Sequence, residues 1–232
     1  MSSAEIAVKA FRRLKSEDLR VLQVMEAAMS KHELVPKEII AKFTKFSLQE
    51  AEFRLNQLDK LRLIRRLQGA YEGYTLNYTG YDCLAINALV KAGVLEAFGK
   101  PLGVGKEADV YDALNPKGER IAVKFHRLGR ISFRQTKRKR GYTPERASWL
   151  FQSRLAAEKE FEALKLVFPY GVAVPEPISQ NRHVIAMGMI DGAELAEWRD
   201  IRKPIEVLKE ILRNVRKAYL KAGVIHADLS EY

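Results

Sequence analysis

The pattern of apolar residues changes near Gly93, and this change constrains the fold more than any other feature of the chain. Before Gly93, apolar residues recur with a helical period behind helix-start signals such as Ser47 with Glu50 three residues later. After Gly93, short apolar segments are separated by turns rich in glycine. The sequence therefore predicts an α+β protein built from two different parts.

Residues 1–80 have the order of elements expected of a winged helix-turn-helix domain. Three helices are predicted before residue 61, the first with Ser16 as its N-cap. Residues 61–67 and 74–78 then predict a two-stranded wing. We assign residues 1–80 to this domain.

A glycine-rich turn and a lysine define the second part. Gly103-Val104-Gly105-Lys106 lies between two predicted strands, where small residues allow backbone amides to approach a phosphate. It is not a Walker A loop, because Glu107 follows where Ser or Thr would be needed. Lys124 lies in the middle of the next predicted strand, where an ammonium group needs a partner. Strand, glycine turn, strand and then a strand with Ala-Val-Lys is the order found in protein kinases.

A long helix and a terminal loop supply the other charged groups that such a site needs. The helix predicted at 147–167 carries three candidate carboxylates, of which Glu160, beside the apolar Phe161, is the preferred partner of Lys124. His226-Ala227-Asp228-Leu229 matches the kinase catalytic loop, in which the aspartate orients the nucleophile. Lys124 and Asp228 are therefore the predicted catalytic residues.

These motifs divide the rest of the chain. Residues 81–93 are assigned to a helical connector capped by Thr79, residues 94–190 to a kinase-like N-lobe, and residues 191–232 to a hinge and a partial helical C-lobe. The lobe is predicted as an antiparallel sheet plus a long helix. Its strands are expected at 94–98, 110–114, 121–125, near Ile178 and at 183–189.

Charge is concentrated in one segment. The chain has 40 Lys and Arg against 29 Asp and Glu, and residues 130–146 alone hold seven basic groups and one acidic group. A cluster this dense favours a polyanionic partner such as RNA, because each basic group that meets a phosphate releases a counterion. No apolar run approaches the ~18 residues of a membrane span. The protein is expected to be soluble and cytoplasmic, with no membrane partner.

The combined motifs resemble the RIO atypical protein kinases. The resemblance rests on 103–107, 123–130, 132–134, 153–155, 159–161 and 226–232, and on 33–36 and 80–82 for the second, winged-helix-bearing subfamily. It implies a serine/threonine kinase or ATPase that uses ATP and Mg²⁺ in maturation of the small ribosomal subunit. The partners it implies are the subunit precursor and its RNA, contacted through the winged helix and the basic segment.

The same resemblance assigns roles to individual residues. Gly103, Val104, Gly105 and Lys106 would form the phosphate loop, with Lys124 and Glu160 as an ion pair beside it. Met187 would lie at the back of the adenine pocket, and the backbone of Gly188 and Ile190 would bind the adenine edge. The expected metal ligands lie beyond Tyr232, so the chain is expected to be a fragment whose own activity is in question.

Two other functions fit parts of the sequence. The winged helix fits a DNA-binding regulator, although the third predicted helix carries as many acidic as basic residues. A nucleotide-binding pseudokinase scaffold fits a chain that lacks half of the metal site.

Overall fold

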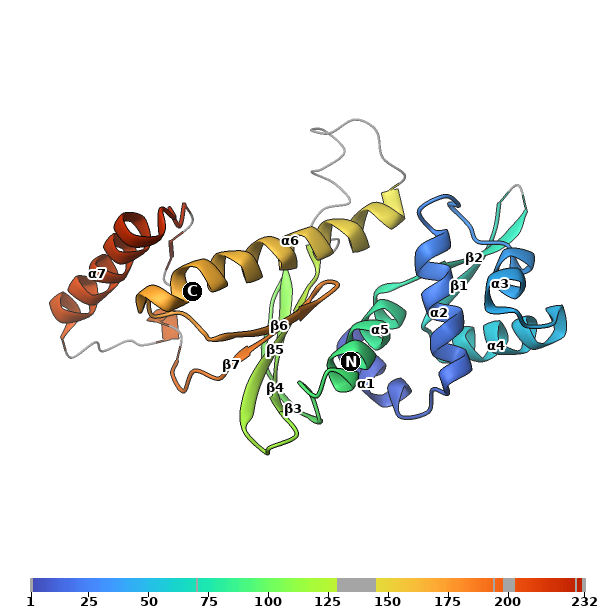
Figure 1. The fold of residues 1–232 in the computed structure, drawn as a ribbon, viewed down its shortest axis with the longest axis horizontal. Coiled ribbons are helices and arrows are strands. Elements are labelled where there is room, and N and C mark those ends of the chain that lie inside the picture. Colours follow the sequence, from blue (N-terminus) through green and yellow to red (C-terminus); the bar gives the residue numbers. More distant parts are fainter. Residues whose placement is uncertain are drawn as a thin grey trace.

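The fold is described from a computed structural model. It describes residues 2–69, 71–128, 145–193, 195–197, 203–227 and 229–230, with side chains from 149 onward in the third of these ranges. The basic segment predicted at 130–146 therefore lies almost entirely outside the described residues, and so does Asp228. Figure 1 shows an N-terminal group of helices at one end, a twisted sheet crossed by a long helix in the middle, and a last helix at the other end.

The N-terminal region contains five helices and a hairpin among its described residues. They are α1 (Ser3–Phe11), α2 (Ser16–Ala28), α3 (Lys37–Thr44), α4 (Leu48–Lys60), β1 (Ile64–Gln68), β2 (Glu72–Leu76) and α5 (Tyr78–Lys91). The hairpin is antiparallel, and Val35 adds a single bridge to Tyr74. The order from α2 to β2 is the one predicted from the sequence.

Local capping differs from the prediction at several helix starts. Lys15, not Ser16, is the N-cap of α2, and the Asp18 carboxylate accepts its backbone N–H at 2.9 Å. Ser47 does cap α4 by accepting from the Glu50 amide at 3.1 Å, but the Glu50 carboxylate accepts instead from Arg54, one turn later. A side chain that finds an ion pair has left the reciprocal half of the capping box.

The helix predicted as a connector belongs to the core. Asn77, rather than Thr79, caps α5. Every residue from Thr79 to Asn87 is buried, so no face of the helix is open to solvent along that stretch. α5 packs on α1, whose Ala4, Ala7 and Ala10 are buried against it. The sequence analysis did not predict α1, although Ser2 and Glu5 form a capping box at its start.

The second part is an antiparallel sheet of five strands in the order β3-β4-β5-β7-β6. The strands are β3 (Ala97–Val104), β4 (Ala108–Leu114), β5 (Arg120–His126), β6 (Pro177–Asn181) and β7 (Val184–Gly188). The first strand thus begins and ends later than the predicted 94–98. It also contains Gly103 and Val104, which had been assigned to the turn.

Two long helices follow: the first runs along the sheet, and the second lies beyond it at the end of the molecule (Figure 1). α6 (Glu145–Val167) is followed by a 3₁₀ turn at Phe168–Tyr170, and α7 (Pro204–Ala222) ends at Gly223 in the left-handed conformation, as its sequence predicts. Alternation along β5 sorts its side chains. Ile121, Val123 and Phe125 join the core shared with the N-terminal helices, and Ala122 joins a smaller cluster with Ala157 of α6.

Candidate nucleotide site

A lysine and a glutamate meet on the α6 face of the sheet. The ammonium Nζ of Lys124 lies 2.7 and 2.8 Å from the two carboxylate oxygens of Glu160, so the predicted contact is present. Lys124 shares a strand face with Ala122, and Glu160 lies one turn beyond Ala157, the α6 residue packed on that face. Both side chains keep solvent contact, at 25% and 33% exposure, so a charged ligand can reach the pair.

A histidine completes this cluster. The ring Nε2 of His126 lies 2.9 Å from the second carboxylate oxygen of Glu160. Burial by itself would raise the pKa of Glu160, but the hydrogen bond from His126 and the charge of Lys124 outweigh it and lower the pKa to about 2. Glu160 is therefore a carboxylate throughout the physiological range, and it holds the Lys124 ammonium in one position.

Apolar residues extend the same sheet face toward β7. Val110 pairs with Lys124 across β4 and β5, and Met187 pairs with Ala122 across β5 and β7. Met187 is buried and packs in the cluster of Ala122, Ala157 and Ile185. The structure thus brings the predicted phosphate-side lysine and the predicted adenine-side methionine onto one face, as a nucleotide lying along it would need.

The glycine turn connects the two strands next to this face. The turn comprises residues 105–107, and the Gly105 N–H donates to the Ala108 carbonyl at 2.8 Å. A Cβ at Gly105 would come within 3.3 Å of that carbonyl, whereas a Cβ at Gly103 would meet no atom within 4 Å. Lys106 and Val104 are exposed. Gly103 is thus open to an approaching ligand, and the fold itself does not require glycine there.

The backbone of Gly188, one of the predicted adenine contacts, makes a hydrogen bond within the fold. The Gly188 N–H donates to the Glu176 carbonyl at 2.8 Å, so within the fold it is already engaged. A Cβ at Gly188 would lie 3.2 Å from the Glu176 Cβ, and this close approach explains the glycine. Ile190 follows the strand and is 60% exposed. The resemblance implies hydrogen bonds from the backbone of Gly188 and Ile190 to adenine. The Gly188 amide is engaged within the fold, and contact of this backbone with adenine stays a prediction.

Asp228, the other predicted catalytic residue, lies outside the described residues. Its neighbours His226 and Ala227 are exposed, and Ala227 has a left-handed backbone with φ of 62°. No group of three His, Cys, Asp or Glu side chains suited to a metal ion occurs in the described part of the chain.

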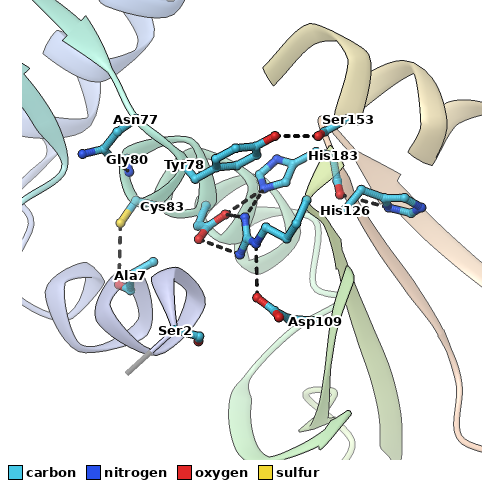
Figure 2. Close-up of polar contacts among 12 residues, drawn as sticks. Ser2, Ala7, Asn77, Tyr78, Gly80, Cys83, Asp109, His126, Ser153 and His183 are labelled. Carbon is cyan, nitrogen blue, oxygen red and sulfur yellow. Dashed lines mark hydrogen bonds and ion pairs between the residues drawn. The ribbon is translucent and has the colours of Figure 1, made fainter. Parts of the chain in front are cut away.

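A second group of charged residues was not predicted. Arg127, directly after β5, donates to both carboxylate oxygens of Asp82 at 2.6 and 2.9 Å and to Asp109 at 3.2 Å. His183 also contacts Asp82, at 2.7 Å (Figure 2). All four side chains are buried. The available signal was Asp82, which is the one charged residue of α5 besides Lys91 at its end.

Burial and pairing set the charge states of this group. Burial lowers the pKa of His183 to about 4 despite the nearby Asp82, so the imidazole is neutral near pH 7. A neutral ring whose Nε2–H donates to Asp82 leaves Nδ1 without a proton, and that nitrogen has no hydrogen-bond partner in the described structure. Burial would raise the pKa of Asp82, but the Arg127 charge and the His183 hydrogen bond lower it, so Asp82 is ionised.

Comparison with known proteins gives the same family for both parts of the chain. The RIO domain family matches residues 109–232, and the Rio2 N-terminal domain family matches residues 11–92. The serine/threonine-protein kinase rio2 of Schizosaccharomyces pombe is 41% identical over 97% of this chain and 66% of its own length. RIO-type serine/threonine-protein kinase Rio2 of Methanocaldococcus jannaschii is 44% identical over 88% of this chain and 76% of its own.

A solved structure has the same fold. The crystal structure of the Rio2 kinase-ADP/Mg²⁺-phosphoaspartate complex from Chaetomium thermophilum matches with a TM-score of 0.79 and 36% identity, over 89% of this chain and 62% of that one. The chain thus spans about two thirds of the length of these two fungal proteins. With a RIO domain, a Rio2 N-terminal domain and Rio2 relatives that match along most of its length, the chain belongs to the Rio2 branch of the RIO kinase family.

Proposed function

We propose that this protein binds ATP with Mg²⁺ as a Rio2-type serine/threonine kinase or ATPase, and that it acts on the maturing small ribosomal subunit in the cytoplasm. The observation that carries the proposal is the ion pair of Lys124 and Glu160, partly exposed beside the glycine turn. Support comes from the Chaetomium thermophilum relative, whose complex holds ADP and Mg²⁺. None of the described helices is long and apolar enough to cross a bilayer.

In this proposal each group of the site has a physical task. Lys124 would neutralise the nucleotide phosphates, and Glu160 would fix the ammonium so that little order is lost on binding. Gly103, Val104, Gly105 and Lys106 would cover the phosphates, and Met187 would contact the base. Asp228 would orient the attacking hydroxyl. Mg²⁺ would neutralise developing phosphate charge, and no described cluster offers it a site of its own.

A titration of ATP in the presence of Mg²⁺ tests the site. Lys124→Ala should weaken ATP binding by about 100-fold, because the phosphates lose the ammonium group that would neutralise them. Lys117→Ala is the matched control, since Lys117 is exposed in the turn between β4 and β5, at the opposite end of β4 from the glycine turn. Equal ATP affinity in Lys124→Ala and the parent chain would refute the assignment.

The RNA part of the proposal concerns a surface rather than a pocket. We propose residues 1–80 as a winged-helix domain, 81–93 as its connection and 94–190 as the N-lobe, with RNA docking by the first domain and the basic segment 130–146. Counterion release predicts affinity for small-subunit RNA that falls steeply as salt is raised. A gel shift with this RNA and with duplex DNA separates the proposal from the DNA-binding alternative, which predicts tighter binding to DNA at physiological salt.

A further inference from the structure

The buried group around Arg127 joins the N-terminal helices to the proposed nucleotide site. Asp82 lies on α5, Asp109 on β4 and His183 in the turn between β6 and β7, and all three contact the Arg127 guanidinium. Figure 2 labels Asp109 and His183 of this group. Burying charges is costly unless each is paired and hydrogen-bonded. Four such side chains in one place therefore ask for an explanation beyond filling a core.

The first path from this group leads to the glycine turn. The backbone N–H of Arg127 donates to the carbonyl of Glu107 at 2.6 Å, at the end of that turn. The Arg127 side chain meanwhile holds Asp109, two residues further along the chain. Both carboxylate oxygens of Asp82 accept hydrogen bonds from the same guanidinium. Asp82 of α5 therefore holds Arg127 in place, and Arg127 in turn holds the glycine turn through Glu107.

The second path leads to the ion pair itself. His183, which contacts Asp82 through its side chain, accepts the backbone N–H of His126 with its carbonyl at 2.9 Å. The His126 ring then contacts Glu160, the partner of Lys124. Tyr81 of α5 stacks on the His183 ring at 4.6 Å and 13°, so the same helix supports this path as well.

The third path reaches α6. The Tyr78 hydroxyl at the start of α5 lies 2.7 Å from the Ser153 hydroxyl and 3.2 Å from the Trp149 carbonyl. Ser153 also accepts the Leu128 backbone N–H at 3.2 Å. Glu160 follows Ser153 by two helical turns on the same face of α6. Tyr78, Tyr81 and Asp82 are therefore linked to the glycine turn, to the strand that carries Lys124 and to the helix that carries Glu160.

We propose that Asp82 and Arg127 are positioning residues of the nucleotide site, through which the N-terminal region sets the geometry of the glycine turn and of the Lys124–Glu160 pair. The inference rests on the proposed function, since it takes the phosphates to be bound there. Coupling of this kind is reciprocal. A ligand of the N-terminal helices that shifts α5 changes ATP affinity, and ATP changes the affinity for that ligand by the same factor.

The test compares ATP with adenosine in three variants of the chain. Asp82→Asn keeps the shape of the side chain and removes its charge, and Tyr78→Phe removes only the hydroxyl that reaches α6. Glu26→Gln is the control, because the Glu26 carboxylate also joins the N-terminal helices to the sheet, through Arg182 at 2.5 and 2.9 Å, but forms no hydrogen bond to Tyr78, Asp82 or Arg127.

Calorimetry with ATP and Mg²⁺ should give a Kd raised about tenfold in Asp82→Asn and about threefold in Tyr78→Phe, with Glu26→Gln unchanged. Adenosine affinity should stay within about twofold of the parent in each variant, because the paths end at phosphate-binding groups. Parent-like ATP affinity in both folded variants, or an equal loss for ATP and adenosine, overturns the inference. Tyr78→Phe alone decides if Asp82→Asn does not fold.

A second measurement separates this inference from the proposed function. Hydrogen exchange without nucleotide should be faster at the Gly105 amide in Asp82→Asn than in the parent chain, because the turn has lost its support. Faster exchange together with no ATP binding by the parent would leave the positioning of the turn standing and refute the nucleotide site. Unchanged exchange at Gly105 refutes the positioning role itself.

Discussion

Two cations three residues apart, Lys124 within β5 and Arg127 directly after it, have opposite surroundings. Lys124 and its partner Glu160 retain 25% and 33% exposure, while Arg127 and its partner Asp82 retain 1% and 0%. Because side chains alternate along β5, Lys124 lies on the face that packs against α6. Arg127, directly after the strand, contacts Asp82 of α5. An accessible pair can exchange its partner for a ligand, whereas a buried pair can only hold its neighbours. The strand β5 thus carries Lys124 of the proposed site, and the residue directly after the strand, Arg127, carries the buried support.

The largest effect expected from this contrast is on stability at Arg127. Arg127→Met should lower the free energy of unfolding by about 3–5 kcal/mol, because Asp82 and Asp109 would be left buried without their cation. Urea denaturation followed by circular dichroism measures the loss. A change below about 1 kcal/mol would mean that water reaches these carboxylates and that the contrast between the two pairs is not real.

The next effect is a pH dependence from His183. Its pKa is lowered from 6.5 to about 4 by burial, so the unfolded chain takes up a proton before the folded one as pH falls. Stability should be full above pH 6.5 and should decline toward pH 4, by on the order of 1 kcal/mol per pH unit. Denaturation at several pH values checks this. In His183→Gln the decline between pH 6.5 and 4 should be smaller, and an unaltered slope would contradict the assignment.

Lys124 should matter little for stability. Lys124→Met should change the free energy of unfolding by less than about 1 kcal/mol, because the pair is partly solvated. Glu160 sharpens the contrast, since its pKa is lowered to about 2 and its contribution is lost only below pH 4.5, a lower window than that of His183. A loss as large as that of Arg127→Met would place both pairs in the same structural class.

The smallest effect belongs to a surface pair in the β1–β2 hairpin. Arg66 contacts Glu72 at 2.5 Å, and both side chains are exposed. Arg66→Gln should leave the melting temperature unchanged, since an exposed ion pair is screened by water and salt. Thermal denaturation at low and high salt checks this, and a clear drop in the melting temperature at both salt concentrations would show that exposure does not separate the pairs.

Sequence reasoning was most successful where the pattern is local. The helices at 147–167 and 205–222 and the strand at 121–125 were predicted within two residues of their observed bounds, and Lys124 meets Glu160 as expected. Burial was harder to predict. The α6 residues that pack on the sheet include small ones, Ser153 and Ala157, which a search for large apolar residues does not find.

The amphipathic helix α7 also shows that burial is hard to predict from the sequence, here because a regular apolar pattern is not buried. Ile205, Leu208, Leu212 and Tyr219 recur with a helical period, and the helix is present where the sequence predicts it. Yet no residue of α7 is buried in the described structure. Period reveals which residues can share a face, but only the neighbouring elements determine what that face contacts.

The sequence by itself determined the order of elements, the glycine turn, the lysine strand and the family resemblance, because spacing and short motifs are properties of neighbouring residues. Only the tertiary structure decided that Asp82, Asp109, Arg127 and His183 meet, since Asp82 and His183 are 101 positions apart in the sequence. It also decided that Gly188 lies too close to Glu176 for a larger side chain to fit easily. Contacts between distant segments depend on how the helices pack, and no local pattern records that packing.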